Sequence, residues 1–255
     1  MSSITQIEAY QKETFTSTLR NGKTVTHDVY TQGNGPKVLI LIQELPGIGQ
    51  ETLALADMFV SEGYTVVLPH LFGKIGKTSM VLNTLKVFCM RKQFRVFAKN
   101  ESSPIVDFLS DLCTHTKEKH QVPGVAVIGM CLTGNFAISL MANEAVLAGF
   151  ASQPSLPLMK QNHIHMSAKE ITDVKNRLDD IGPMHCARIQ GDKICTAQRF
   201  DVYRKTFNAD RERIILHELP GDGHSILTLD FVDEAGHPTK EALNDVLTYF
   251  NNQLN

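Results

Sequence analysis

The sequence has no excess of charge of either sign and no paired cysteines, and each absence excludes a class of protein. Its 25 Lys and Arg residues nearly balance its 27 Asp and Glu residues, which leaves a net charge of -2. Such a chain offers no basic surface for nucleic acid or for an anionic membrane. Its five cysteines are scattered and form no CxxC pair, which argues against a disulfide framework or a zinc ribbon. We therefore expect a cytoplasmic protein with reduced thiols and no bound metal.

Long hydrophobic runs are also missing. Val38–Ile42 is very short, and the apolar stretch Phe136–Ala151 is interrupted by Asn143 and Glu144. A membrane helix needs about 20 apolar residues in succession. The first residues are polar and charged, where a secretory signal would carry a basic start and an apolar run. We expect neither a membrane span nor secretion by that route.

What the sequence does contain is a steady alternation of strand and helix patterns over 255 residues. No repeat, low-complexity tract or linker divides the chain, so we expect one domain over residues 1–255. The alternation predicts an α/β fold with a mostly parallel central sheet and helices on both faces. The expected strands are Val38–Ile42, Thr65–Pro69, Gly124–Gly129, Val146–Ala151, Cys186–Gln190 and Ile214–Leu219. The expected helices are Glu51–Glu62, Lys77–Lys119 with a break near residues 102–104, Leu132–Asn143, Ala168–Leu178, Ala197–Phe207 and Thr239–Asn251.

The N-terminal residues follow a different pattern. Two short β-rich runs, Phe15–Leu19 and Val25–Tyr30, are separated by Asn21-Gly22. Asn-Gly between such runs is typical of a tight hairpin turn. We therefore predict an N-terminal antiparallel hairpin.

The segment GMCLTG, residues 129–134, lies where a buried strand runs directly into a helix. This is the setting of a nucleophile elbow, in which small neighbours permit a strained turn and the helix N-terminus stabilises negative charge. Cys131 is the candidate nucleophile. A typical elbow has glycine two places after the nucleophile, whereas this chain has Thr133 there and Gly134 next. The alternative is a buried structural cysteine at a tight turn.

A nucleophilic thiol needs a base, and the base needs a group that orients it. Asp192 follows the strand Cys186–Gln190, and His224 follows the last strand, so the chain order is nucleophile, acid, base. Three such residues at the carboxyl ends of strands predict a Cys131–His224–Asp192 triad. Asp222 is a less suitable acid because it shares a short turn with His224.

Two backbone N–H groups are expected to form the oxyanion hole. One belongs to Leu132, directly after the nucleophile, and the other to Leu45, in the loop after the strand Val38–Ile42. Glu44, at the end of the same strand, is a reasonable proton acceptor for a nearby thiol, because a carboxylate in that position is costly unless it is paired or functional. A solvated loop glutamate is the alternative.

These segments together resemble the dienelactone hydrolase family of the α/β-hydrolase fold. The resemblance rests on GMCLTG, on Asp192 in GDKICT, on His224 in GDGHS and on Glu44 in QELPG. It implies that Glu44 activates the Cys131 thiol as substrate arrives, that His224 acts as base during acyl transfer and hydrolysis, and that Asp192 orients His224.

The resemblance also implies arginines that bind the substrate carboxylate in members that cleave dienelactone. Arg91 and Arg95 could supply the one before the nucleophile, although a solvated helix face is an equally simple explanation. No arginine follows His224, so dienelactone itself is in doubt as substrate. Gln153, after the strand that follows the elbow helix, is a further candidate substrate-binding residue, in an irregular stretch that extends to His165.

We therefore expect a hydrolase that cleaves a small ester or lactone without a cofactor, as a monomer or a small homo-oligomer. A general carboxylesterase or thioesterase is an open alternative. So is a redox sensor in which Cys195 resolves an oxidised Cys131, and so is a non-catalytic protein on the same fold. The His163 and His165 pair lacks a third ligand at metal-binding spacing, and Gly76-Lys77-Thr78 lacks the glycine and the strand of a phosphate loop.

Overall fold

The computed structural model describes residues 4–45, 47–73, 75–76, 103–157 and 160–255. Its strands are β1 (Gln11–Thr18), β2 (Thr24–Gln32), β3 (Lys37–Ile42), β4 (Tyr64–Pro69), β5 (Val125–Met130), β6 (Val146–Ser152), β7 (Met184–Ile189) and β8 (Ile214–Leu219). Its α-helices are α1 (Gln50–Ser61), α4 (Pro104–His120), α5 (Gly134–Leu140), α6 (Ala168–Ile181), α7 (Ala197–Phe207) and α8 (Pro238–Leu254). Short 3-10 turns, η1 and η2, span Ile7–Ala9 and Cys131–Thr133.

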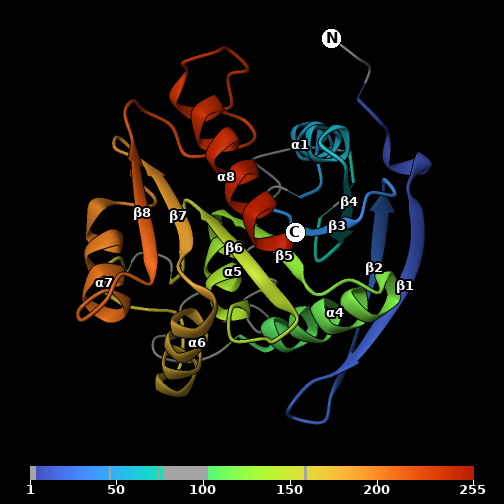
Figure 1. Ribbon diagram of the computed structural model, residues 1–255, viewed down its shortest axis with the longest axis horizontal. Helices are drawn as coiled ribbons and strands as arrows, with labels where there is room; N and C mark the ends of the chain where they lie inside the picture. Colours follow the sequence, from blue (N-terminus) through green and yellow to red (C-terminus); the bar gives the residue numbers. More distant parts are fainter. Residues whose placement is uncertain (1–3, 46, 74, 77–102, 158–159) are drawn as a thin grey trace.

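The strands form one eight-stranded sheet in the order β1-β2-β4-β3-β5-β6-β7-β8 (Figure 1). Strands β3 to β8 are parallel to one another, while β2 pairs antiparallel with both β1 and β4. The order reverses at β3, whose neighbours are β4 on one side and β5 on the other. Ligands of open parallel sheets bind beyond the carboxyl ends of the strands at such a reversal. The fold thus directs attention to the loops after β3 and β5.

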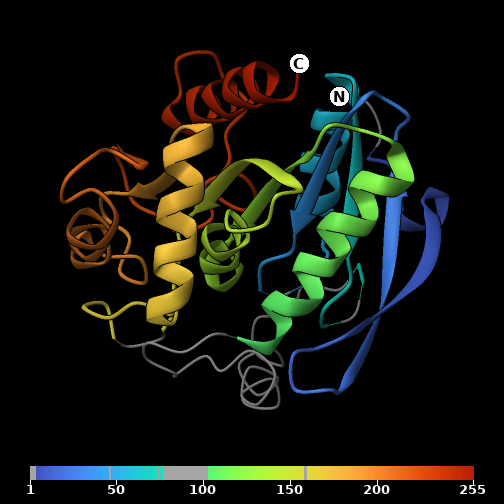
Figure 2. The ribbon, with the colours of Figure 1, turned by 60° about the horizontal axis from the view of Figure 1, so that its bottom comes forward.

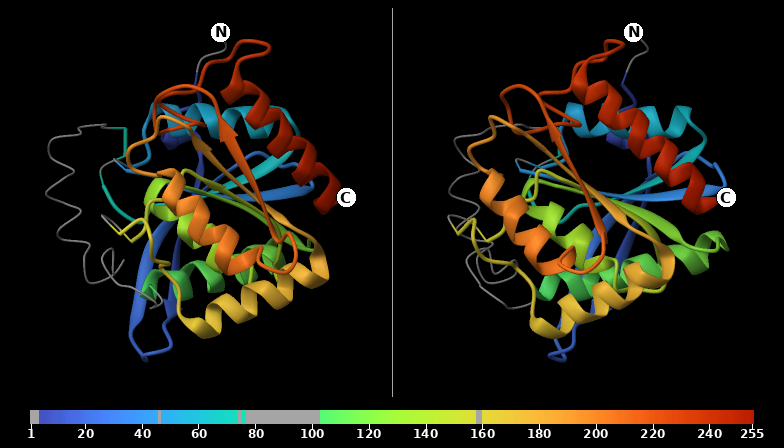
Figure 3. Two further views of the ribbon diagram at one scale, coloured as in Figure 1. Left: turned by 90° about the vertical axis from the view of Figure 1, so that its left-hand side faces the viewer. Right: turned by 60° about the vertical axis from the view of Figure 1, so that its left-hand side comes forward.

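The sheet is covered on both faces, as its apolar strands require. Every residue of β4 and β5 is buried, because a parallel strand packs against helices on each side. One core joins the sheet to α4, α5, α6 and α7, and the other joins it to α1 and α8. The two groups of helices lie on opposite sides of the sheet in Figure 3, and Figure 2 shows α4, α5 and α6 along one face. Among the helices described, none combines the length and the apolar character that a bilayer crossing requires.

The two edge strands carry charged side chains. On β1, Glu13 pairs with Lys119 at 2.8 Å. On β8, Glu218 lies between two arginines, with its Oε2 2.5 Å from Arg188 Nη1 and its Oε1 2.7 Å from Arg204 Nη2. An exposed ion pair such as Glu13–Lys119 adds little to stability, so its effect lies in the polarity that it gives to the edge, whereas the Arg188 side chain is buried.

The expected fold class is confirmed, and the differences are in the element bounds. The hairpin forms at Asn21-Gly22, and Gly22 adopts a φ of 78° that favours glycine. The helix expected over Leu132–Asn143 is shorter, because the chain first makes the turn η2 and α5 begins only at Gly134. Of the long helical region expected over Lys77–Lys119, residues 77–102 lie outside the described residues, and α4 accounts for the remainder.

Candidate active site

The turn after β5 has the backbone strain of a nucleophile elbow. Cys131 has a φ of 56°, in the left-handed region that a residue with a side chain rarely adopts. A Cβ atom at Gly129 would lie 2.2 Å from the carbonyl oxygen of Thr133, and one at Gly134 would lie 2.9 Å from the carbonyl oxygen of Ser152. Both glycines are therefore required for the chain to turn so closely. The turn leaves Cys131 partly exposed at the carboxyl edge of the sheet.

Thr133, where a glycine was expected, has an ordinary conformation and ties the elbow to β3. Its φ and ψ of -81° and -11° are right-handed helical, so glycine is not needed there. Its Oγ1 accepts a hydrogen bond from Met130 N–H at 2.9 Å. It also lies 2.9 Å from the carbonyl oxygen of Met130 and 3.3 Å and 3.1 Å from those of Ile42 and Gln43. The buried hydroxyl thus connects the strand end that carries Cys131 with the strand end that carries Glu44.

The structure brings Asp192 and His224 together from the ends of β7 and β8. Asp192 Oδ2 accepts a hydrogen bond from His224 Nδ1 at 2.7 Å, and its Oδ1 accepts from the N–H groups of Ile194 and Cys195 at 2.7 Å and 3.0 Å. The carboxylate is buried, and these donors fix its position. Asp222, by contrast, packs against Gly191, where its Oδ1 occupies the space of a Cβ atom.

The surroundings of His224 raise the affinity of its imidazole for a proton. Burial of the ring disfavours the charged form, but the hydrogen bond with Asp192 and the interaction with the nearby Cys131, together with the charges of both groups, raise the pKa of His224 to about 10. Nε2 is buried and has no regular hydrogen bond to a protein group in the described part of the chain. This nitrogen is thus available for proton transfer with the thiol and with a substrate.

Glu44 is buried among neutral hydrogen-bond donors. Its Oε1 accepts from the Thr228 hydroxyl, and its Oε2 accepts from Ser225 Oγ at 3.2 Å and from Gln153 Nε2 at 3.3 Å. Burial raises the pKa of Glu44, and these donors and the charge of His224 offset only part of that effect. For the residues that the structure describes, no hydrogen bond joins this carboxyl to Cys131, so its expected role toward the thiol stays a prediction.

The backbone N–H groups of Leu45 and Leu132 belong to the loop after β3 and to the turn η2, and their role as oxyanion donors stays a prediction. Leu132 is in the first turn of η2, where N–H groups have no partner within the helix. Within the described ranges, neither N–H group donates a backbone hydrogen bond outside a regular element. Leu45 directly follows Glu44 in the loop after β3. The two donors thus come from the two strand ends at which the order of the sheet reverses.

The loop after β6 adds two side chains to this cluster. Gln153 is fully buried with a φ of 36°, and its amide binds Glu44, so its expected contact with substrate stays a prediction. Ser155, which lies in the same segment as Gln153, donates from Oγ to Cys131 Sγ at 3.4 Å. Arg91 and Arg95 lie outside the described residues.

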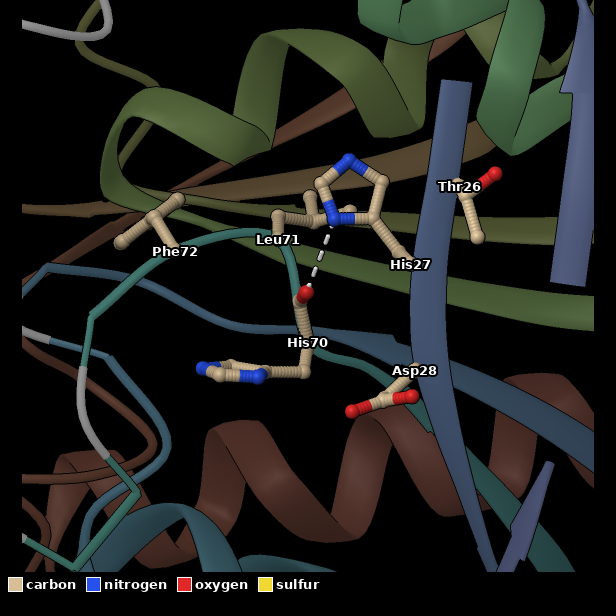
Figure 4. Close-up of a pocket in the computed structure, with 6 residues that line it drawn as sticks. All are labelled: Thr26, His27, Asp28, His70, Leu71 and Phe72. Carbon is tan, nitrogen blue, oxygen red and sulfur yellow. Dashed lines mark hydrogen bonds between the residues drawn. The ribbon is translucent and has the colours of Figure 1, made fainter. Parts of the chain in front are cut away.

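Two cavities open along this edge of the sheet. One of about 490 Å³ lies beside His224 and the loop Gly191–Ile194. The other, of about 310 Å³, lies between β2 and the end of β4, and its wall is joined by a hydrogen bond of 3.1 Å between the His27 ring and the His70 carbonyl oxygen (Figure 4). Gln43 connects the second cavity to the site, because its amide bonds to Leu71 N–H and to the Phe72 carbonyl oxygen. The first cavity is the nearer to the expected chemistry.

Candidate metal ligands do not gather in the described structure: it contains no group of three His, Cys, Asp or Glu side chains that could hold an ion. The ring of His163 bonds to its neighbour Asn162, whose carbonyl oxygen is 2.9 Å from Nδ1. The side chains that meet at this edge of the sheet are instead the Cys131 thiol, the His224 imidazole and the carboxyls of Asp192 and Glu44. Such a set suits acyl transfer without a metal ion.

Known proteins share this architecture. Hydrolase tropI from Talaromyces stipitatus is 25% identical over 153 residues, which cover 58% of this chain and 53% of that protein, so the chain spans about half the length of this curated relative. The dienelactone hydrolase from Anabaena variabilis superposes with a TM-score of 0.57 at 14% identity and covers 96% of this chain and 99% of its own. The esterase Pf2001 from Pyrococcus furiosus gives 0.64 at 12% identity and covers 97% and 94%. These structures share the fold.

The family assignment rests on the sequence itself. The model of the dienelactone hydrolase family matches residues 28–254, from the middle of β2 to the end of α8. The match includes every strand of the parallel sheet and each of Glu44, Cys131, Asp192 and His224. The resemblance that the short motifs indicated therefore extends over nearly the whole chain, which belongs to the dienelactone hydrolase family.

Proposed function

We propose that this protein is a hydrolase that cleaves a small ester or lactone through a thioester on Cys131. The observation that carries the proposal is the strained backbone of Cys131, at a φ of 56°, in the same site as a His224 ring that is bonded to Asp192 at 2.7 Å. Strain of this kind persists only where the surrounding structure enforces it, and it places a side chain in reach of a ligand.

In the first half of the reaction the thiol is acylated. The proton of Cys131 passes to Glu44, and Sγ forms a bond to the carbonyl carbon of the substrate. The carbonyl oxygen becomes an oxyanion, which accepts hydrogen bonds from the N–H groups of Leu45 and Leu132. When the carbonyl re-forms, the bond to the leaving oxygen breaks, and that oxygen takes the proton from His224. A lactone keeps this hydroxyl on its acyl chain.

In the second half water releases the acyl group. His224 takes one proton from a water molecule, whose oxygen attacks the thioester carbonyl. The bond between carbon and Sγ breaks, and the carboxylic acid leaves. The sulfur takes back the proton held by Glu44, and His224 keeps the proton that it took from water. Asp192 stabilises the imidazolium in both halves, as the raised pKa of His224 indicates. No cofactor takes part in this scheme.

Glu44 is proposed to assist the thiol when substrate arrives. A raised pKa makes its carboxylate a stronger base than an exposed one. The carboxyl also accepts hydrogen bonds from Gln153 and Ser225, which belong to the loops near Cys131 and His224. To accept the proton of Cys131 it must leave at least one of its present donors. Arrival of a substrate carbonyl in the site is the event that we propose to cause this movement.

The alternatives differ in what the thiol does. A general carboxylesterase or thioesterase would use the same site and differ in substrate preference. A redox sensor would need a resolving thiol, and Cys195 suits that role poorly, because it is fully buried and burial raises the pKa of its thiol. Free thiols at four described cysteines support a reducing compartment, and we propose a cytoplasmic monomer or small homo-oligomer.

The test is turnover of an aryl acetate, a dienelactone and an acyl thioester, with intact-mass detection of an acyl adduct. We expect Cys131→Ala to lose both turnover and adduct, and His224→Ala to lose about 100-fold or more in rate. Pairing each ester with an analogue that carries a carboxylate identifies the substrate class. Wild-type protein that turns over no ester and forms no adduct would contradict the proposal.

A further inference from the structure

Ser155 touches the sulfur that the proposed function makes the nucleophile. It lies three residues beyond the end of β6 and is fully buried. Its backbone N–H donates to the carbonyl oxygen of Cys131 at 3.1 Å, and its Oγ lies 3.4 Å from Cys131 Sγ. These two contacts between Ser155 and Cys131 hold the hydroxyl beside the sulfur.

The Ser155 hydroxyl has one proton and two acceptors. Besides Cys131 Sγ, its Oγ can donate to the carbonyl oxygen of Gln153 at 3.0 Å. A neutral thiol is a weak acceptor, so the carbonyl is preferred while Cys131 is protonated. A thiolate is charged, and a hydrogen bond to a charged acceptor is roughly twice as strong as a neutral one. The proton of Ser155 therefore has reason to turn toward the sulfur when the thiol ionises.

We propose that Ser155 is a catalytic residue that stabilises the thiolate of Cys131. The inference rests on the proposed function in taking Cys131 as the nucleophile. No bond of Ser155 breaks in this role: the thiol proton goes to Glu44, and the hydroxyl keeps its own proton and turns it toward Sγ. The same hydroxyl returns to the Gln153 carbonyl when the sulfur is acylated and loses its charge.

The loop around Ser155 is anchored on both sides, which holds the hydroxyl in place. Before it, Pro154 packs so closely on Gly134 that a Cβ atom there would lie 3.0 Å from the Pro154 Cα. After it, Leu156 N–H donates to Asn135 Oδ1 at 2.8 Å. A donor that needs no rearrangement at the moment of reaction contributes most to the stabilisation of charge.

Further along the same loop, the buried guanidinium of Arg199 donates to three backbone carbonyl oxygens, which belong to Pro157, Lys160 and His163. Arg199 is fully buried in α7, so this anchor is part of the core. The segment that carries Ser155 is thus fixed to α5 at one end and to α7 at the other.

The other ionisable groups near Cys131 act differently from a neutral donor. His224 supplies a cation, and Asp192 stabilises that cation. Glu44 is bonded to Gln153 and to Ser225, and as an anion it would oppose a thiolate. Cys195 interacts with Cys131, and burial keeps its own thiol protonated by raising its pKa. Ser155 is therefore the neutral side-chain donor to the sulfur among the residues described.

The test measures the thiol itself and needs no hydrolase substrate. The rate of alkylation of Cys131 by iodoacetamide is followed by intact mass between about pH 5 and pH 10, with the signal of Cys131→Ala subtracted. We expect Ser155→Ala to slow alkylation about tenfold at neutral pH, as loss of one hydrogen bond to a charged group predicts, and to approach the wild-type rate at high pH. Ser155→Thr, which keeps a hydroxyl, should restore most of the rate.

The matched control is Ser139→Ala, which removes a buried hydroxyl from α5 without a contact to Cys131. It should leave the pH profile unchanged. If Ser155→Ala does not fold, the comparison is repeated with Ser155→Thr and Ser155→Val. These two side chains have the same shape, but valine has a methyl group where threonine has the hydroxyl. A folded Ser155→Ala with the wild-type profile would overturn the inference. If alkylation depends on Ser155 while no ester is turned over, the proposed function fails and Ser155 loses its catalytic role, although its stabilisation of the thiolate stands.

Discussion

At the scale of single residues, the site contains two buried groups that both hold a proton more tightly than usual, for different reasons. Glu44 does so because burial disfavours the carboxylate. His224 does so because Asp192 and Cys131 favour the imidazolium by more than burial disfavours it. The folded protein stabilises the neutral form of Glu44 and the charged form of His224. Their pH dependences therefore separate the two causes.

Glu44→Gln should increase the free energy of unfolding at pH values above the ordinary pKa of a carboxyl group. Because the folded state binds the Glu44 proton more tightly than the unfolded state, wild-type stability falls as pH rises through and above the ordinary value of 4.5. Glutamine has the same shape and stays neutral. We expect equal unfolding free energies near pH 4 and a gain of about 1–3 kcal/mol for the variant near pH 8, measured by urea unfolding. A less stable variant near pH 8 would show that the carboxylate is the favoured form.

Asp192→Asn should lower the pKa of His224 from its value of about 10. The imidazolium contributes stability below the ordinary value of 6.5, and that contribution is lost as pH rises through about 10. The variant should therefore be less stable than wild type below about pH 6.5, and the difference should shrink toward pH 10. Nitrogen NMR of the imidazole follows the titration directly. Asp222→Asn, a nearby carboxyl not bonded to His224, should leave it in place; equal shifts in both variants would contradict the assignment.

At the scale of elements, the elbow is held by the residue that departs from the usual pattern. A glycine two places after the nucleophile usually allows neighbouring backbone segments to approach closely. Here Gly129 and Gly134 allow that approach, because a Cβ atom at either position would contact backbone atoms. Thr133 is then free to use its hydroxyl as a connection between the ends of β5 and β3. Threonine in place of glycine therefore changes which contacts hold the turn.

Thr133→Val should weaken that connection. Valine has the same shape but cannot accept from Met130 N–H or donate to the carbonyl oxygen of Gln43, and both groups are buried. An unsatisfied buried group costs about 1–3 kcal/mol, so urea unfolding should show a loss of that size. Thr133→Ser, which keeps the hydroxyl, should lose much less. Equal stability of the valine variant and wild type would mean that the hydroxyl does not secure the elbow.

Elements with a strong local pattern were predicted well. The apolar run Val38–Ile42 became β3 nearly residue for residue. The helix expected over Leu132–Asn143 was too long at both ends, because η2 precedes α5 and α5 ends at Leu140. At its start, the Thr133 hydroxyl lies close to the carbonyl oxygens of Ile42 and Gln43, which the local sequence does not reveal. Tertiary contacts override helical propensity at such places.

The same division applies to the candidate site. Asp192 and His224 could be selected because a triad needs an acid and then a base in the loops after the later strands, and parallel strands end at one edge. Ser155 and Thr228 lie in such loops too, but serine and threonine are common loop residues, so residue type did not distinguish them. Their contacts with Cys131 and Glu44 depend on the paths of loops, and the sequence contains no short-range signal for such paths.

At the scale of the whole molecule, one sheet separates two cores. Phe108 of α4 belongs to the core on one face, and Phe250 of α8 belongs to the core on the other. Both rings are fully buried. Because every strand of the parallel sheet contributes to both faces, loss of packing on either side should weaken the same structure. We therefore propose that residues 1–255 unfold as a single domain.

Phe108→Ala and Phe250→Ala test this cooperativity. Each should lower the unfolding free energy by about 3–5 kcal/mol, because the ring is lost and a cavity remains. Calorimetry should show a single transition for wild type and for both variants, with the calorimetric and van't Hoff enthalpies equal. Two transitions, of which each variant shifts only one, would indicate two independently folding units.

The charged edges of the sheet have a consequence for behaviour at high concentration. An edge strand offers unpaired backbone groups to any other chain, and this is a route to aggregation. On β8, Glu218 is held between Arg188 and Arg204, and on β1, Glu13 is paired with Lys119. A strand that added to either edge would have to bury these charges. The long sheet is thus protected against growth from molecule to molecule at the two places where it ends.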